Sequence, residues 1–374
     1  MEIEITEEQE LLREMSARFI ESNCPLVAVR EFMDDKRGIT TDYLTQTAEL
    51  GWYSLLVSEE YGGGQVSESG ISDAAIVAEE RGRLVQPGAF ISSNLVALAI
   101  SEFGSEDQRS SLLPDLMAGA SIATWATADT SGNWDLGAGV TATRSENGVV
   151  LDGTKGLVQD AHIADSILVT ANLNGSPIHL IVPAASSGVT VKPLESLDIT
   201  RRFGRITFEQ AEFPLELALG FPDDGIRLWE RLTDVAAVLT VAESVGALSY
   251  LFDMVVEYSK DRWAFGRPIG SFQSIKHTLA NTGLLLEMCR AMSAAATRAV
   301  AGNDDSASEV ASMAKAFVGK NCIEASHECF QVFGGIGYTW EHDQHLYFRR
   351  LAVDAALFGE PAWHRERICK IHQL

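Results

Sequence analysis

Two glycine-rich stretches decide the fold of this 374-residue chain: Arg262-Trp-Ala-Phe-Gly-Arg-Pro-Ile-Gly-Ser-Phe-Gln273 and Gln331-Val-Phe-Gly-Gly-Ile-Gly-Tyr-Thr-Trp-Glu341. Each one follows a long segment with helical periodicity, and glycine interrupts a helix because its backbone is conformationally permissive. The residues alone leave two interpretations open. Either each stretch is a tight turn between helices, or its arginines and exposed glycine N–H groups bind an anion such as a pyrophosphate.

The N-terminal third, upstream of these stretches, has a helical pattern. Thr6 followed by Gln9 predicts a capping box, which satisfies backbone N–H groups at the start of a helix. Leu12, Met15 and Phe19 then recur at helical spacing and are expected on one buried face. We expect only helices from residue 6 to about residue 122.

The middle third changes to short β-branched runs separated by turn residues. Asn147-Gly148 and Asn174-Gly175 are typical of the two-residue turns that join antiparallel strands. After the turn-rich segment 221–225 the helical period returns, and the polar segment 302–308 predicts a connection between two helices. The order is therefore helical, antiparallel β and helical.

Composition excludes several classes of protein. The chain has 52 Asp and Glu against 29 Lys and Arg, a formal charge of −23, and 46% hydrophobic residues. A disordered chain needs lower hydrophobicity, and a nucleic-acid binder needs a positive surface for the phosphates. The five cysteines include no C-x-x-C pair, the start MEIEITEEQE is acidic, and no run approaches about 18 consecutive apolar residues. We expect a cytoplasmic protein without disulfides, a signal peptide or a membrane span.

Common catalytic and metal motifs are missing from the sequence. There is no Walker loop, G-x-S-x-G elbow, H-E-x-x-H or G-x-G-x-x-G. His342 and His345 are three residues apart, but their polar neighbours favour a solvated charged face of a helix. No metal site is predicted.

In this order and spacing, the two glycine-rich stretches resemble the C-terminal motifs of the acyl-CoA dehydrogenase family. The segments 49–63 and 77–82 resemble its N-terminal helices. The resemblance implies an α+β fold with an N-terminal α-helical domain (1–122), a middle antiparallel β-barrel domain (123–225) and a C-terminal four-helix bundle (226–374). It also implies an FAD cofactor bound between two subunits of a tetramer.

The resemblance assigns two half-sites for FAD. The half donated to a neighbouring subunit is intact and comprises Arg262, Phe265, Phe272, Gln273, Gln331, Gly334 and Gly335. The half that holds the chain's own flavin ring is degraded at residues 128–135 and 155–160. There the family's flavin-facing Thr is replaced by Ala128, a small Ser by Trp134, and an aromatic Trp by Leu157.

Both positions at which the family carries its catalytic Glu lack a carboxylate. They are occupied by Gly359 and Ala236, so no catalytic residue is assigned. Glu360 is one residue away from the first position and Glu230 is six residues before the second. Asp234 is expected to face away from the site, in a surface capping role.

The sequence therefore predicts a non-catalytic subunit of a heteromeric acyl-CoA dehydrogenase. The resemblance is to α₂β₂ enzymes that act on CoA thioesters of steroid side chains. The implied partners are a homologous catalytic subunit, an acyl-CoA substrate and an electron-transferring flavoprotein. Two alternatives stay open: a homotetrameric enzyme that uses Glu360 or Glu230 as its base, and a scaffold without enzymatic function.

Overall fold

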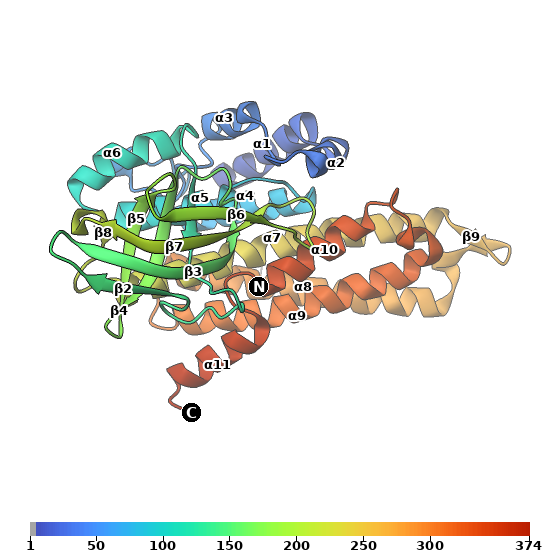
Figure 1. The fold of residues 1–374 in the computed structure, drawn as a ribbon. Coiled ribbons are helices and arrows are strands. Elements are labelled where there is room, and N and C mark those ends of the chain that lie inside the picture. Colours follow the sequence, from blue (N-terminus) through green and yellow to red (C-terminus); the bar gives the residue numbers. More distant parts are fainter. Residues whose placement is uncertain (1–4) are drawn as a thin grey trace.

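The computed structural model describes residues 5–374, which form helices, then a sheet, then helices again along the chain (Figure 1). Residues 1–4, at the start of the acidic N-terminal stretch, lie outside the described part. The predicted α+β fold class and the order of its regions are confirmed. The boundaries after residues 122 and 225 stay a prediction; β1 begins at Ala123 and α7 at Gly225.

The N-terminal helices begin with the predicted capping box. Thr6 Oγ1 accepts from Gln9 N at 3.2 Å, and Gln9 Oε1 accepts from Thr6 N at 3.3 Å. Leu12 is buried and Phe19 packs on the core, but Met15 is 47% exposed, so the prediction for Met15 was wrong. The buried face of α1 passes through Ser16 instead of Met15, because the polar side chains of Gln9 and Ser16 also turn toward the core. The helices are α1 (Glu7–Asn23), α2 (Leu26–Asp34), α3 (Thr41–Glu49), η1 (Glu59–Tyr61), α4 (Gly70–Arg83), α5 (Phe90–Phe103) and α6 (Glu106–Met117).

The middle region is a sheet with the strand order β6-β7-β3-β2-β4-β5-β8, and β1 lies beside β4. Asn174 and Gly175 both have positive φ, 54° and 91°, which confirms a type I′ turn between β4 and β5. The strands are β1 (Ala123–Ala126), β2 (Val140–Arg144), β3 (Val149–Gln159), β4 (Ser166–Leu173), β5 (Ser176–Pro183), β6 (Val189–Leu194), β7 (Phe203–Phe213) and β8 (Ala218–Leu219), with the 3₁₀ turn η2 (Leu215–Leu217) before β8.

The sheet differs from the predicted antiparallel barrel in two respects. The pairs β1·β4 and β2·β4 are parallel, and β6 and β8 end the strand order without pairing with each other in the described residues. Parallel pairs need long connections, and each of these pairs is joined through other strands of the same sheet. Hairpin turns in the sequence predict only antiparallel neighbours, so the sequence pattern could not indicate the two parallel pairs.

The C-terminal region is built around the 37-residue helix α7 (Gly225–Asp261). By length and composition α7 is the one described helix able to cross a membrane, but 89% of its most apolar window is buried inside the protein. It packs against α4, α5 and the following helices. Those are α8 (Gln273–Ala301), α9 (Ala307–Phe333), α10 (Gln344–Ala356) and α11 (Pro361–Ile371), with β9 (Trp263–Ala264), β10 (Arg267–Pro268), η3 (Ile269–Ser271) and η4 (Gly334–Tyr338) between them.

Two glycines allow α4 and α7 to cross with their backbones in contact. A Cβ at Gly82 would overlap Glu243 O on α7, and a Cβ at Gly246 would overlap Glu79 O on α4. Any larger residue at either position therefore forces the helices apart. This crossing joins the N-terminal helices to the C-terminal bundle.

A network of buried charges next to this crossing joins the middle region to the C-terminal helices, and its Arg350 Nη2 also donates to Val85 O of the N-terminal region at 3.1 Å. Arg350 Nε lies 2.6 Å from Asp198 Oδ2 and its Nη1 lies 2.8 Å from Glu243 Oε1. Arg201 pairs with Glu243, and its Nη1 lies 2.6 Å from Asp354 Oδ1. Burial raises the pKa of Asp354 to about 7, whereas the two guanidiniums lower the pKa of Glu243 against the effect of burial. Asp354 is therefore the carboxyl that takes up a proton first, which leaves two carboxylates facing two guanidiniums.

We expect Arg350→Met to lower the free energy of unfolding by about 3–5 kcal/mol, because it leaves buried Asp198 without its ion-pair partner and leaves Glu243 with one guanidinium instead of two. Urea denaturation at equal chain concentration measures this change. The control is Arg18→Met on the surface of α1, where the side chain is 76% exposed, and it should change the free energy of unfolding by less than about 0.5 kcal/mol. Equal effects of the two substitutions would contradict the structural role of the network.

Candidate functional site

The two glycine-rich stretches lie together at one end of the C-terminal bundle. The first forms the β9–β10 hairpin and η3 between α7 and α8, and Figure 1 shows β9 at the tip farthest from the sheet. The second forms η4 after α9. Tyr258 Oη near the end of α7 donates to Phe333 O at the end of α9 at 3.3 Å, which holds the two stretches beside each other.

Arg262 presents an unpaired guanidinium at this tip. Its backbone N donates to Tyr258 O at 2.9 Å and its O accepts from Ile269 N at 2.8 Å, so the backbone of Arg262 is fixed. Its side chain is exposed and forms no hydrogen bond or ion pair among residues 5–374. Arg267, by contrast, lies over the ring of Phe272 at 4.0 Å. Arg262 is therefore the cation of this stretch that can bind an anion from outside the chain.

The glycine pair leaves an open surface next to α9. Gly334 has φ 62° and ψ −135°, a conformation that only glycine adopts easily, and its N–H closes α9 on Phe330 O. A Cβ at Gly334 or Gly335 would meet no atom within 4 Å. Gly335 lies in the first turn of η4, where N–H groups have no partner within the helix. We call the open backbone at Gly334 and Gly335 the cradle. It suits a group that approaches from outside the chain.

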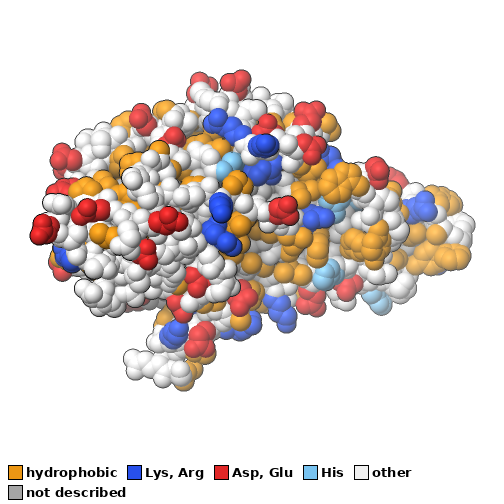
Figure 2. Space-filling view, viewed as in Figure 1, with side chains coloured by type: hydrophobic (Ala, Val, Ile, Leu, Met, Phe, Trp, Pro, Cys, Tyr) orange, Lys and Arg blue, Asp and Glu red, His pale blue; other side chains and the backbone are white. Residues whose placement is uncertain are grey.

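The remaining predicted cofactor residues belong to the same two stretches. Gln331 is exposed, Gln273 Nε2 lies 2.8 Å from His277 Nε2, and Phe265 is 96% exposed with its ring nearly perpendicular to that of Phe272. Figure 2 shows hydrophobic side chains gathered at this tip. Exposed aromatic and aliphatic groups of this size indicate a surface that another molecule covers; they are Trp263, Phe265, Ile336, Tyr338 and Trp340.

The degraded motifs meet in a different place, between the sheet and the N-terminal half of α7. There three aromatic rings pack together: the ring centroid of Phe358 lies 5.9 Å from that of Trp125 and 5.6 Å from that of Trp134. All three side chains are buried. Two remaining cavities beside them have volumes of about 10 Å³ each. Small-molecule pockets usually hold several hundred Å³, so neither cavity has room for a flavin ring.

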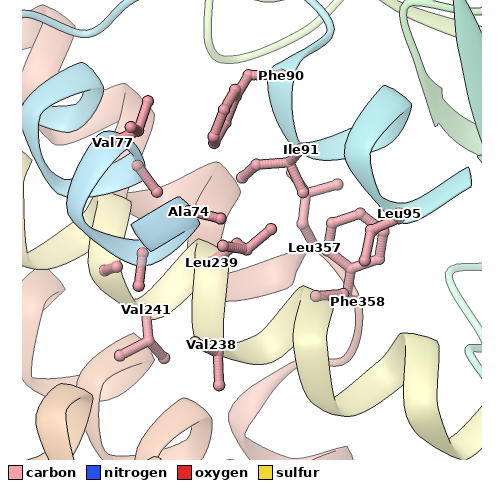
Figure 3. Packing of buried hydrophobic residues seen from close by; sticks show 14 of the residues in the cluster. Ala74, Val77, Phe90, Ile91, Leu95, Val238, Leu239, Val241, Leu357 and Phe358 are labelled. Carbon is pink, nitrogen blue, oxygen red and sulfur yellow. The ribbon is translucent and has the colours of Figure 1, made fainter. Parts of the chain in front are cut away.

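Packing on both sides fixes this aromatic cluster. Figure 3 shows Leu357 and Phe358 pointing into the core between α5 and α7, toward Ile91 and Leu95. Buried Lys155 holds the loop that carries Trp134, because its Nζ donates to Thr127 O at 2.8 Å and to Ala138 O. Burial lowers the pKa of Lys155 to about 7. The cluster is therefore part of the core, and sequence reasoning missed the contributions of Trp125 and Phe358.

Neither position at which the family carries its base holds a carboxylate in this structure. Gly359 has φ 106°, and a Cβ there would lie 2.5 Å from Trp363 Cε3 and 2.8 Å from His364 Nε2. Ala236 is fully buried on α7. Glu360 and Glu230 are exposed, and neither lines the two small cavities beside the aromatic cluster.

Asp234 corrects one sequence-based expectation. It is buried, and its carboxylate lies 2.6 Å from Arg367 Nη1 and 2.6 Å from Ser308 Oγ. It therefore forms an ion pair between α7 and α11 rather than a surface cap. Asp234 lines neither of the two small cavities, and C-terminal residues that the local helical pattern cannot show cover its side of α7.

The two histidines also differ from the prediction. His342 and His345 precede or begin α10 and are half-buried, with ring centroids 4.5 Å from Phe333 and 4.8 Å from Trp340 respectively. They are packing partners of aromatic rings rather than members of a solvated helical face. Within residues 5–374 there is no group of three or more His, Cys, Asp or Glu side chains able to hold a metal ion.

The cradle and the aromatic cluster lie at opposite ends of α7. Thr233 borders the cavity at the aromatic cluster and Arg262 caps the far end of the helix. At 1.5 Å per residue they are roughly 40–45 Å apart along the axis. One dinucleotide cofactor cannot span that distance, so the two places cannot belong to one site within one chain.

Comparisons with known proteins agree with this architecture. The family model "Acyl-CoA dehydrogenase, N-terminal domain" matches residues 6–120, and "Acyl-CoA dehydrogenase, C-terminal domain" matches residues 223–371. The chain is similar to acyl-CoA dehydrogenase IpdE2 of Mycobacterium tuberculosis, with 31% identity over 95% of this chain and 94% of the relative.

Solved structures share the fold. The ChsE4-ChsE5 complex from Mycobacterium tuberculosis superposes with a TM-score of 0.90 at 24% identity, covering 100% of this chain and 99% of the matched chain. A Tcur3481-Tcur3483 steroid ACAD variant superposes with a TM-score of 0.89 at 24% identity and 98% coverage of both chains. At this level of identity the two matches establish the fold alone.

We expect Gly359→Ala to lower the free energy of unfolding by about 2 kcal/mol or more, because the added Cβ meets Trp363 and His364 at a positive φ. Thermal or urea denaturation measures the loss. Gly132→Ala is the matched control, since this glycine has φ 84° but nothing within 4 Å of its Cβ position, so only backbone strain should remain. A larger loss at Gly132 would mean that packing around Gly359 is not the constraint.

Proposed function

Because the chain belongs to the acyl-CoA dehydrogenase family of FAD-dependent oxidoreductases, we propose that it is the non-catalytic subunit of a heteromeric acyl-CoA dehydrogenase. One observation carries the proposal. Trp125, Trp134 and Phe358 fill the place where the degraded motifs meet, while the cradle at the other end of α7 stays open. The chain can thus contribute half of an FAD site without holding a flavin ring of its own.

The residues of the cradle fit the pyrophosphate end of FAD. Arg262 offers a charge-assisted fork to phosphate oxygens, and the open backbone at Gly334 and Gly335 lets the phosphates approach closely. Gln273 and Gln331 add amide groups beside them. A cation matters here because the chain's net charge of −23 disfavours anions elsewhere on the surface.

The chemistry would then take place on the partner subunit. When bound, FAD supplies the acceptor for the hydride in α,β-dehydrogenation of an acyl-CoA. This chain binds and orients the phosphate end, and its exposed aromatic tip excludes water from that end of the site. The proton of the acyl Cα needs a carboxylate base, which a homologous catalytic subunit would provide because Gly359 and Ala236 cannot.

The proposed assembly is an α₂β₂ heterotetramer with one FAD for each pair of unlike chains. An electron-transferring flavoprotein would reoxidise the flavin, as the family resemblance implies. A steroid side-chain CoA thioester is the proposed substrate, and the solved steroid enzyme with the same fold agrees with that choice. In such a tetramer, aromatic side chains of the two copies of this chain would fill two of the four flavin sites. The catalytic subunits would then carry out the reaction, and this chain would bind the phosphate end of FAD.

Expressed alone, the chain should contain no flavin, because its own ring site is filled and no partner supplies the other half. Coexpression with the homologous catalytic subunit should yield a yellow complex with about one FAD per two chains. Visible absorbance near 450 nm, together with the chain ratio on a gel, measures this. A yellow homotetramer with one FAD per chain would instead favour the homotetrameric enzyme with an unusual base.

Arg262→Ala in this chain should remove FAD from the complex although the catalytic subunit is unchanged. Loss of a charge-assisted pair at an interface should weaken FAD binding roughly 30- to 1000-fold. Arg262→Lys should restore only part of it, because an ammonium group cannot form a bidentate pair. Flavin content after gel filtration is the readout.

Arg18→Ala, on the exposed face of α1, is the control and should retain full flavin. Full flavin in the Arg262→Ala complex would show that this chain does not donate the phosphate site. An intact complex that keeps flavin and activity regardless of Arg262 would favour the scaffold alternative.

A further inference from the structure

Tyr258 on α7 contacts both of the stretches that form the proposed FAD half-site. Its backbone O accepts from Arg262 N at 2.9 Å, and its hydroxyl Oη donates to Phe333 O at 3.3 Å. Arg262 carries the guanidinium that is proposed to bind phosphate, and Phe333 directly precedes Gly334 of the cradle. A single residue therefore links the cation to the glycine pair.

Phe333 lies at the point where the direction of the cradle is set. It is the last residue of α9 and the N-cap of η4. The two glycines that follow have no side chains to anchor them, and a Cβ at either position would meet no atom within 4 Å. The orientation of their N–H groups therefore depends on the residues on either side, of which Phe333 is one.

Ring packing places the hydroxyl of Tyr258 against this carbonyl. The ring centroids of Tyr258 and Phe333 lie 5.1 Å apart with the planes tilted by 54°. The side chain of Phe333 is buried and its ring also packs on His342, at 4.5 Å between centroids. Ring contacts tolerate sliding, whereas a hydrogen bond has a preferred direction. The hydroxyl of Tyr258 therefore adds a directional restraint to an apolar contact.

We propose that Tyr258 is a positioning residue of the FAD half-site, which holds the backbone of Gly334 and Gly335 where it reaches the same pyrophosphate as Arg262. This inference rests on the proposed function and adds to it a residue that acts through Arg262 and Phe333. Donors that are already ordered bind an anion more tightly than mobile ones, because less conformational entropy is lost on binding.

The test substitution is Tyr258→Phe, which removes the hydroxyl and keeps the ring packed on Phe333. In the coexpressed complex the dissociation constant for FAD should rise about three- to tenfold, as expected for the loss of one neutral hydrogen bond. A dilution series of the complex, followed by the rise of flavin fluorescence on release, measures this change. Turnover should recover when free FAD is added in excess, because no reacting group has been altered.

Tyr347→Phe is the matched control. Tyr347 Oη also donates to a backbone carbonyl at a helix end, that of Arg83 on α4, at 2.7 Å, and Tyr347 is fully buried. Loss of this shorter, buried bond should lower the free energy of unfolding at least as much as Tyr258→Phe does. It should leave the dissociation constant for FAD unchanged. A purely structural role for Tyr258 predicts instead that FAD affinity follows stability in both variants.

Hydrogen exchange in the full chain without FAD gives a second readout. Tyr258→Phe should speed amide exchange in peptides that cover residues 331–338, because the end of α9 and the start of η4 lose an anchor. Tyr347→Phe should not change exchange in these peptides. This measurement requires neither a flavin nor a partner subunit.

Three results would overturn the proposal. These are an FAD dissociation constant for Tyr258→Phe within about twofold of the unmodified complex, unchanged exchange at residues 331–338, and equal release of FAD from the Tyr347→Phe complex. FAD retained by Tyr258→Phe but lost by Arg262→Ala would remove this inference alone. FAD retained by both variants would remove the proposed function as well.

Discussion

The buried pairing of Arg201 and Arg350 with Asp198, Glu243 and Asp354 is the interaction on which the rest of the structure depends. Its members come from the loop before β7, from α7 and from α10, so the middle region and the C-terminal helices must both be in place before the network is complete. Burying these groups costs several kcal/mol per ion unless their partners are positioned well. The network therefore favours one relative placement of sheet and bundle over near alternatives. Asp354 lies near the end of α10, so the network also fixes the following turn, which carries Phe358.

Helix α7 separates the aromatic cluster from the cradle. At its N-terminal half the core closes around aromatic rings, and at its C-terminal end the backbone is open and the cation is free. Because the helix is 37 residues long, the distance between its ends excludes use of both by one cofactor within the chain. In the proposed function, a chain whose aromatic cluster fills one end can still offer the cradle at the other end to a partner subunit. A duplicated subunit can therefore lose its own ring site and still be required for assembly of the cofactor site.

Local signals predicted the parts of the fold that depend on local physics. The Thr6 capping box and the Asn174-Gly175 turn were correct because a few neighbouring residues determine them. Met15 and the two histidines were placed incorrectly because a polar pattern does not show which polar side chains turn inward or pack on aromatic rings. Asp234 was placed incorrectly because Ser308 and Arg367, far along the chain, decide its surroundings. The parallel pairs of the sheet were missed for the same reason.

The candidate site divides along the same line. The cradle was predictable because its residues lie in two short stretches whose spacing is typical of a family. The aromatic cluster was predictable only in part: Trp134 stood out as a replacement of a small residue, whereas Trp125 and Phe358 join it through packing alone.

The glycine crossing of α4 and α7 has a consequence for assembly. Because Gly82 and Gly246 place backbone against backbone, no side chain at the joint can change rotamer to let the helical regions rock against each other. A partner must therefore accept a preformed surface rather than mould one. Association then loses little conformational entropy on this side, and its specificity depends on shape complementarity that is already present in the free chain.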